Sequence, residues 1–291
     1  MRTFVSFCAA IIFGFATTAT AALTNVNWFA RTWQMEDGLP NNNVNSLAQT
    51  PDGFLWVATP MGLARFDGTS FDEISLTNFI GLGNRGVAAL LAGHDGGLWA
   101  EMDRGAVVDL NVNKTITINL TNAPFDSAAK TMIECDDGTL WFSYAGGAIS
   151  FLKDGKATVI SWQMGLPWAS FNSIAKDTQG RIWLARAGVV GIFRNGRFQR
   201  LAQPGNSFIR LAAARDGGVW ICAGAQLFHF DEGALLEKVG ELPAVNSDVE
   251  PSAVIEDRHG GVWIGTTYNG LFRFDGSRIE KIPVSHPEIS S

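Results

Sequence analysis

Near its C-terminal end the chain reads Ile255-Glu256-Asp257-Arg258-His259-Gly260-Gly261-Val262-Trp263-Ile264-Gly265-Thr266, followed by Gly270-Leu271-Phe272-Arg273-Phe274-Asp275-Gly276. A polar turn ending in glycine leads into an aliphatic-tryptophan pair. A second glycine separates this pair from an alternating apolar run, which ends at an Asp-Gly turn. Short apolar runs bounded by such turns predict antiparallel strands joined by hairpins.

The same unit occurs six times, and its most regular feature is a tryptophan with a glycine three residues before it. The tryptophans are Trp56, Trp99, Trp141, Trp183, Trp220 and Trp263, and the glycines are Gly53, Gly96, Gly138, Gly180, Gly217 and Gly260. An acidic residue precedes each glycine, and an apolar residue lies nine positions before each tryptophan. A period of roughly 40 residues with four short strands predicts a β-propeller blade.

Each column of the repeat has a physical reason. The glycine is expected to adopt positive φ in a tight turn, with the nearby aspartate accepting backbone hydrogen bonds. Asp-Gly or Asn-Gly pairs such as Asp67-Gly68, Asp154-Gly155 and Asn195-Gly196 predict hairpins between the third and fourth strands. A blade cannot bury both faces alone, so the tryptophan column is expected to pack between neighbouring blades. Sandwiches do not repeat a four-strand unit, and the turns interrupt every candidate amphipathic helix.

The predicted fold is therefore an all-β propeller of four-stranded antiparallel blades. The six blades are expected at 44–86, 87–128, 129–170, 171–207, 208–250 and 251–291. Residues 22–43 are expected to form an N-terminal closing strand and loop, because Trp33-Gln34-Met35 recurs as Trp162-Gln163-Met164 at the end of the third repeat. This leaves half a blade over, which favours a seven-bladed ring whose seventh blade lies beyond Ser291, in a fragment of a longer protein. Imperfect closure is the alternative.

Residues 1–21 have the layout of a secretory signal peptide. Arg2 precedes an apolar run over residues 4–15, and Ala19-Thr20-Ala21 forms an A-x-A cleavage site. The alternative, a membrane anchor, is disfavoured because a span needs about 20 apolar residues. The mature chain is therefore expected in the periplasm without membrane contact. Cleavage removes Cys8, and Cys135 and Cys222 are expected to be free thiols because they lie in repeats that are not neighbours.

The composition excludes two broad classes of protein. Of 291 residues, 46% are hydrophobic and only 17% are charged, which argues against a disordered chain. The formal net charge of −6 argues against a partner that is a nucleic acid, since binding a phosphate backbone needs a basic surface.

The repeat of residues 255–276 resembles the two-component regulator propeller repeat. The opening Trp33-Gln34-Met35-Glu36-Asp37-Gly38-Leu39-Pro40, running into Val44-Asn45-Ser46-Leu47, resembles the start of the sensor region in the same proteins. The resemblance implies a periplasmic sensor propeller of a histidine kinase, hybrid two-component or diguanylate cyclase receptor. The membrane span and output domain would lie outside this sequence, so the chain itself is expected not to be an enzyme.

Loops converge at one mouth of a propeller channel, where ligands are usually bound. The loops expected there supply these candidate ligand-binding residues: Asn42, Asn43, Arg104, Tyr144, Trp168, Arg186, Tyr268 and Asn269. Aromatic, amide and guanidinium side chains suit a carbohydrate or an anion, and no metal or cofactor is expected. The G-x-G-x-x-G string at residues 81–86 falls in an inter-repeat loop rather than between a strand and a helix, so nucleotide binding is disfavoured.

Two other functions remain open. A free-standing secreted propeller could act as a protein-interaction scaffold. Alternatively, streptogramin-lyase-like propellers have a similar Gly-x-aliphatic-Trp strand, and such an enzyme would need a histidine and an acidic residue at the channel mouth. His94 and His259 lie in or beside the polar turns, which argues against that role.

Overall fold

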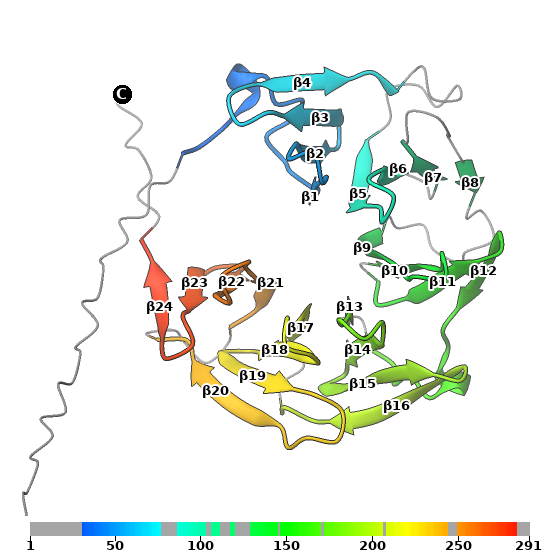
Figure 1. The fold of residues 1–291 in the computed structure, drawn as a ribbon, viewed down its shortest axis with the longest axis vertical. Coiled ribbons are helices and arrows are strands. Elements are labelled where there is room, and N and C mark those ends of the chain that lie inside the picture. The colour runs from blue at the N-terminus through cyan, green and yellow to red at the C-terminus, as the bar shows by residue number, and fades with distance from the viewer. Residues whose placement is uncertain are drawn as a thin grey trace, which may run out of the picture.

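The computed structural model describes residues 31–76, 86–102, 106–110, 117–119, 129–144, 146–169, 172–205, 208–243 and 249–283. These residues form six four-stranded antiparallel sheets, which confirms the prediction of an all-β propeller with six such blades. Figure 1 shows the sheets arranged around an axis, with the first strand of each sheet innermost. The expected signal peptide at 1–21 and residues 81–85 of the glycine-rich string lie outside the described residues.

Each blade consists of four strands that are consecutive in sequence. Blade 1 contains β1 (Ser46–Gln49), β2 (Leu55–Thr59), β3 (Gly62–Phe66) and β4 (Phe71–Ile74). Blade 2 contains β5 (Val87–Ala92), β6 (Leu98–Met102), β7 (Ala106–Asp109) and β8 (Thr117–Asn119). Blade 3 contains β9 (Ala129–Glu134), β10 (Leu140–Tyr144), β11 (Ile149–Lys153) and β12 (Lys156–Val159). Blade 4 contains β13 (Asn172–Lys176), β14 (Ile182–Arg186), β15 (Val189–Arg194) and β16 (Arg197–Ala202). Blade 5 contains β17 (Ile209–Ala213), β18 (Val219–Ala223), β19 (Gln226–Phe230) and β20 (Glu237–Glu241). Blade 6 contains β21 (Pro251–Glu256), β22 (Val262–Thr266), β23 (Gly270–Phe274) and β24 (Ile279–Ile282).

The glycine column forms the turn between the first and second strands, as predicted. All six glycines have positive φ, from 77° at Gly138 and Gly180 to 117° at Gly217. In the turn of blade 4, Asp177 Oδ1 accepts hydrogen bonds from the backbone N–H groups of Gln179 and Arg181 at 2.9 Å. The aspartate thus replaces backbone partners that the turn leaves unpaired.

Two kinds of hairpin join the third and fourth strands. Asp154-Gly155 and Asn195-Gly196 each have positive φ at both residues, as a two-residue type I′ turn requires. At Asp275-Gly276 only the glycine has positive φ, and Asp275 Oδ1 accepts hydrogen bonds from the backbone N–H groups of Ser277 and Arg278. The predicted hairpins are confirmed, and the same Asp-Gly pair occurs in a two-residue loop after β11 and in a four-residue loop after β23.

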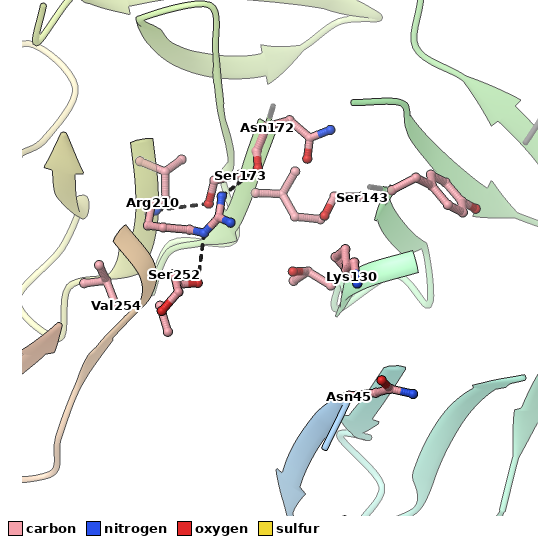
Figure 2. Close-up of a pocket in the computed structure, with 13 residues that line it drawn as sticks. Asn45, Lys130, Ser143, Asn172, Ser173, Arg210, Ser252 and Val254 are labelled. Carbon is pink, nitrogen blue, oxygen red and sulfur yellow. Dashed lines mark hydrogen bonds between the residues drawn. The ribbon is translucent and has the colours of Figure 1, made fainter. Parts of the chain in front are cut away.

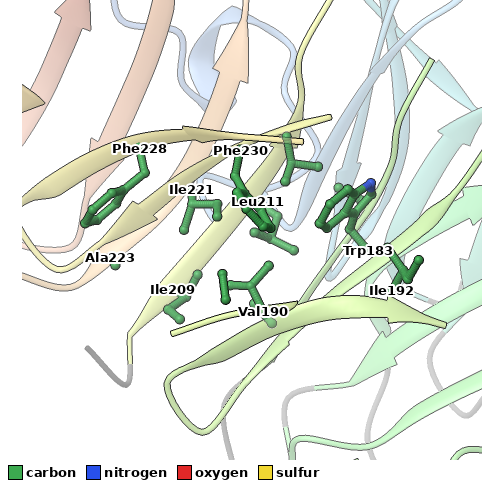
Figure 3. Packing of buried hydrophobic residues seen from close by; sticks show 13 residues of the cluster. Trp183, Val190, Ile192, Ile209, Leu211, Ile221, Ala223, Phe228 and Phe230 are labelled. Carbon is green, nitrogen blue, oxygen red and sulfur yellow. The ribbon is translucent and has the colours of Figure 1, made fainter. Parts of the chain in front are cut away.

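Five of the six repeat tryptophans pack between consecutive blades, as predicted, and Trp263 of blade 6 is the exception among the described residues. Figure 3 shows the buried cluster in which Trp183 of blade 4 lies with Ile209, Ile221 and Phe230 of blade 5. Trp183 is fully buried, its ring meets Phe230 edge-on at 5.7 Å, and its Nε1 donates a 2.7 Å hydrogen bond to Asp177 Oδ2. Equivalent clusters join the other consecutive pairs of blades.

The ring is open between blade 6 and blade 1. Figure 1 shows the sheet β21–β24 separated from β1–β4, and within the described residues no buried cluster joins them. Leu47 of β1 is 56% exposed, although its equivalents Leu90 and Leu211 are buried against the preceding blade. Ile255 of β21 is 62% exposed, although its equivalent Ile133 packs in the cluster between blades 3 and 4. Both faces therefore have the composition of a blade interface, and no blade that the structure describes covers them.

The N-terminal segment covers the outer part of the open face of blade 1. Trp33 meets Phe66 and Phe71 edge-on, with ring centroids 4.9 Å and 5.7 Å apart. The segment then forms the short 3-10 helix η1 (Met35–Asp37) and buries Leu39. Of the expected closing strand and loop at 22–43, the described part from residue 31 contains this helix and no strand.

Cys135 of blade 3 and Cys222 of blade 5 are free thiols, and burial raises the pKa of Cys222 to about 12. Across the part of the chain that the structure describes, no helix has the length and apolar character needed to cross a membrane.

Candidate functional site

The innermost strands surround a cavity of about 540 Å³ on the axis of the ring. Its lining combines polar side chains from five blades with a few apolar ones: Asn45, Lys130, Thr131, Ser143, Tyr144, Asn172, Ser173, Ile174, Arg210, Leu211, Ser252, Ala253 and Val254. We call this space the axial cavity. Its volume is in the range of sites for small organic ligands.

Arg210 extends from β17 into the axial cavity (Figure 2). Its Nε donates to the backbone oxygen of Ser252 at 2.9 Å, and its Nη1 donates to the backbone oxygen of Asn172 at 3.3 Å. Burial lowers the pKa of this guanidinium, and the charge of Glu250 acts in the opposite direction. Arginine stays protonated in proteins, so a positive charge is held at this wall between blades 4 and 6.

Lys130 lies on β9, across the axial cavity from Arg210, as Figure 2 shows. The residue before it, Ala129, donates its backbone N–H to Glu101 Oε2 at 2.7 Å. Glu101 is fully buried in blade 2 and is not part of the lining. The buried Glu101 side chain thus holds the start of the strand that carries Lys130, while Lys130 itself is exposed.

Two serines at equivalent positions connect neighbouring blades around the axis. Ser46 Oγ accepts a hydrogen bond from the backbone N–H of Leu90 at 3.1 Å, and Ser173 Oγ accepts one from Leu211 at 3.0 Å. Asn45 forms a similar link, with its Nδ2 donating to the backbone oxygen of Val87 at 2.8 Å. These bonds fix the spacing of the inner strands and so the shape of the axial cavity.

Among the candidate residues from the sequence, Tyr144 lines the axial cavity. It is buried, its hydroxyl is 3.2 Å from Ser150 Oγ, and burial raises its pKa to about 12. Arg186 is also buried, and its Nη2 donates to the backbone oxygen of Ala169. That bond gives Arg186 a part in holding the loop between blades 3 and 4.

The other candidate residues that the structure describes are not among those that line the axial cavity. Trp168 and Tyr268 are 88% and 87% exposed. Asn42 Oδ1 accepts a hydrogen bond from the backbone N–H of Met35, and the backbone N–H of Asn269 donates to Thr266 Oγ1. Asn43 lies in the exposed loop before β1. Arg104 lies outside the described residues.

Most of the lining of the axial cavity is absent from the sequence-based candidates. Five lining residues lie ten or eleven positions before the tryptophans of five blades, on the innermost strand or directly before it: Asn45, Lys130, Asn172, Arg210 and Ser252. A polar residue at that column, in a strand that is otherwise apolar, is the signal that could have identified them.

A second hollow, of about 520 Å³, lies between blades 3 and 4 around Trp141. Asp136, Asp137 and Lys153 are among its lining residues, and Lys153 Nζ lies 2.7 Å from Asp137 Oδ2. This hollow thus presents charges of both signs that are already paired. Among the described residues, no group of three His, Cys, Asp or Glu is arranged to hold a metal ion.

Residues 38–61 match the family model described as two component regulator propeller. The match covers the start of blade 1 and confirms the resemblance inferred from the sequence. No curated protein matches the chain.

Several solved structures share the fold. Virginiamycin B lyase from Staphylococcus aureus aligns with a TM-score of 0.66 and 16% identity, covering 84% of this chain and 85% of that one. The extracellular domain of a putative hybrid two component system from B. thetaiotaomicron aligns with a TM-score of 0.67 and 20% identity, covering 85% of this chain and 34% of that one. A second such domain from B. thetaiotaomicron has a TM-score of 0.60 and 22% identity, over 79% of this chain and 32% of that one. The chain therefore spans about a third of those extracellular domains.

Proposed function

We propose that this chain is the ligand-binding propeller of an exported receptor of the two-component type. The observation that carries the proposal is the match of residues 38–61 to the two component regulator propeller, on a ring with a polar axial cavity. The likeness in fold to extracellular domains of putative hybrid two component systems supports it. The ligand binds in the axial cavity, where inner strands from five blades can sense it together.

The receptor is exported to the periplasm by residues 1–21, which are cleaved near Ala21. The support is the order of one cation, an apolar run and an A-x-A site. In this arrangement the ligand is met outside the cytoplasm, and the output domain, a histidine kinase or a similar enzyme, acts inside it.

A seventh blade from the same polypeptide fills the opening between blades 6 and 1. The exposure of Ile255 and Leu47 supports this, because residues at the equivalent repeat positions pack against a neighbouring blade at the closed interfaces. Trp33 supports it as well, since it packs on Phe66 from the side on which the preceding blade would lie. A further repeat would offer a tryptophan to blade 1 and an aliphatic column to Trp263.

The propeller itself is proposed to bind rather than to catalyse. The described lining of the axial cavity holds no histidine and no carboxylate, which supports binding over acid–base chemistry at that place. The fold is also that of virginiamycin B lyase, so incubation with virginiamycin B is the matching test. The antibiotic is expected to stay intact, and its cleavage would favour the enzyme instead.

The experiment that tests the proposed function has two parts. Sequencing the gene beyond codon 291 is expected to show another Gly-x-aliphatic-Trp repeat, then a membrane span and an output domain. A stop codon directly after codon 291 would contradict it and favour a free-standing scaffold. Expression in a Gram-negative host is expected to give periplasmic protein that begins after Ala21; cytoplasmic protein that keeps residues 1–21 would contradict export.

A further inference from the structure

The interface between blades 3 and 4 has a hollow at each end. Within the described lining, the axial cavity reaches past an innermost strand at blade 3, where Ser143 and Tyr144 of β10 contribute to it. The other lining residues lie on the innermost strand of their blade or directly before it. The second hollow, of about 520 Å³, opens at the same interface around Trp141. We call the part of the axial cavity between Ser143 of blade 3 and Asn172 of blade 4 the arm (Figure 2).

The arm follows from a difference between two neighbouring strands. In blade 3, Thr131 is paired with Ser143. The next pair is Ala129 with Tyr144, so Lys130 is the extra residue of a β-bulge, which bends its strand. The neighbouring innermost strand, β13, pairs with β14 without such a shift. A bent strand thus lies beside a regular one, and β13 has more extensive contact with β17 on its other side than with β9.

The second hollow corresponds to a place that an arginine fills at the next interface. Arg181 of blade 4 forms ion pairs with Asp231 and Glu232 of blade 5. The equivalent position of blade 3, two residues before the repeat tryptophan, holds Thr139. A threonine side chain is too short to reach the next blade, and Thr139 lines the second hollow. Blades 4 and 5 are thus tied by ion pairs at the place where a hollow separates blades 3 and 4.

Between the two hollows the interface is packed, because a buried apolar cluster around Trp141 joins the blades. Two polar side chains also cross it. Asn172 Nδ2 donates to the backbone oxygen of Ala148 at 3.2 Å. Lys176 Nζ donates to Asp136 Oδ1 at 3.0 Å, and a lysine side chain is long enough to keep this bond through a small rotation of the blades. A packed centre with open ends is the geometry of a hinge.

We propose that the ring bends at the interface between blades 3 and 4, and that a ligand in the arm sets the angle between these blades. This rests on the proposed function, in that it takes the axial cavity to be the binding site, and it adds how binding there is transmitted. The ligand contacts blade 3 through Ser143 and blade 4 through Asn172, so its binding free energy depends on the angle. A ligand shifts an equilibrium between angles by its differential affinity for them.

The place of this interface in the ring makes the bend effective. Three blades lie on each side of it, and the opening between blades 6 and 1 lies across the ring from it (Figure 1). Hydrogen bonds between neighbouring blades join each set of three: Ser46 with Leu90, Glu101 with Ala129, Ser173 with Leu211, and Arg210 with Ser252. A change of angle at the hinge therefore changes the width of the opening, where the seventh blade is proposed to lie.

Distances between pairs of nitroxide spin labels, measured by double electron–electron resonance, test the bend without a ligand. Lys156→Cys with Glu237→Cys labels blades 3 and 5, a pair that spans the proposed hinge. Arg197→Cys with Lys281→Cys labels blades 4 and 6, a matched pair that lies on one side of it. All four positions are exposed, and Cys135→Ser provides the background because the other cysteine of the mature chain is buried. The first pair is expected to give a distance distribution about twice as wide as the second. Equal widths would overturn the proposal.

Variants that fill either hollow test whether the bend lies at this interface. Thr139→Arg places at the second hollow the side chain that Arg181 supplies between blades 4 and 5. Ser143→Gln extends a polar side chain into the arm, as a ligand group does. Each is expected to narrow the distribution of the first pair by about half and to leave the second pair unchanged. Thr158→Gln, on the outermost strand of blade 3 and outside the lining of both hollows, is the matched control, expected to change neither pair.

An unchanged width of the first pair in both filling variants would overturn the proposal, and so would equal narrowing in Thr158→Gln. Narrowing by Thr139→Arg alone would retain the hinge and overturn the role of the arm. Far-UV circular dichroism shows whether each variant folds, and the two label pairs in the background chain decide the question of the hinge if a filling variant does not. Export and the gene sequence beyond codon 291, which test the proposed function, are independent of all these outcomes.

Discussion

Replacing the repeat tryptophan at a closed blade interface and on the open face of blade 6 tests whether the ring is open there. Trp183 is fully buried between blades 4 and 5, and its Nε1 donates to Asp177, which is 3% exposed. Trp183→Ala leaves a cavity and removes one partner of a buried carboxylate, so the expected loss is about 4 kcal/mol. Trp263 makes the same bond to Asp257 at 2.8 Å but lies on the face without a neighbouring blade. Water can replace the lost contacts there, so Trp263→Ala is expected to cost about 1 kcal/mol.

The assay is guanidinium chloride unfolding followed by far-UV circular dichroism, with the free energy of unfolding obtained by linear extrapolation. Both variants are compared with the parent chain. An unchanged slope of the free energy of unfolding against denaturant concentration shows that the unfolding transition is the same. Milder variants, Trp183→Phe and Trp263→Phe, rank the two sites if Trp183→Ala does not fold. Equal losses at the two positions would refute the open face of blade 6, because they would mean that Trp263 is covered to the same extent as Trp183.

Three further variants or groups test local features. Gly191→Ala would place a Cβ against the backbone oxygen of Gln199, so it should lower the free energy of unfolding by about 3 kcal/mol or more, whereas Gly146→Ala, with open space around it, should change it by less than about 0.5 kcal/mol. The backbone N–H of Arg278, followed by the hydroxyl and backbone N–H of Ser277, donates hydrogen bonds to Asp275 and lowers its pKa from 3.8 to about 2. The ionised Asp275 therefore stabilises the fold above pH 4, and this stabilisation is lost as the pH falls towards 2. In Asp275→Asn the melting temperature should depend less on pH over that interval. In the chain from residue 22 on, a thiol reagent at pH 8 should modify Cys135 in the folded state and Cys222 only after unfolding, because Cys222 is fully buried with its pKa raised to about 12.

The fold could be predicted from the sequence because local and interblade requirements coincide in one repeat. Gly180 adopts positive φ in its turn, and Asp177 accepts hydrogen bonds from the turn backbone. Trp183, three residues after the glycine, is then placed on the face that meets the next blade. Each of these features depends on a residue type that few others can replace, so repetition of the pattern identifies it.

The packing of the N-terminal segment could not be predicted from the matching letters. Trp33-Gln34-Met35 repeats Trp162-Gln163-Met164, yet the helical turn η1 begins at Met35, whereas its counterpart η3 (Trp162–Met164) begins at the tryptophan. What aligns the two segments is the following left-handed glycine, Gly38 or Gly165, with the buried leucine after it. The identical tryptophans therefore occupy different environments: Trp162 is 76% exposed, and Trp33 packs on Phe66.

The candidate site was harder to predict because polar side chains at the axis repeat in only some of the blades. The column that supplies Asn45, Lys130, Asn172 and Ser252 in four blades holds Ala88 in blade 2. The residue type at this column therefore varies around the ring, from asparagine in blades 1 and 4 to lysine in blade 3 and serine in blade 6. Loop position instead favours exposed aromatic residues, and one of these, Tyr268, is 87% exposed and is not among the residues that line the axial cavity.

The open ring is tested most directly by hydroxyl-radical footprinting of the isolated chain, read out residue by residue with mass spectrometry. Leu47 is 56% exposed and its column equivalent Leu211 is 7% exposed, so Leu47 is expected to be oxidised several-fold faster. Ile255, 62% exposed, is expected to react faster than Ile133, which packs in the cluster between blades 3 and 4. Protection of Leu47 and Ile255 equal to that of Leu211 and Ile133 would contradict the account, because it would show that blade 6 closes directly onto blade 1 and leaves no place for a seventh blade.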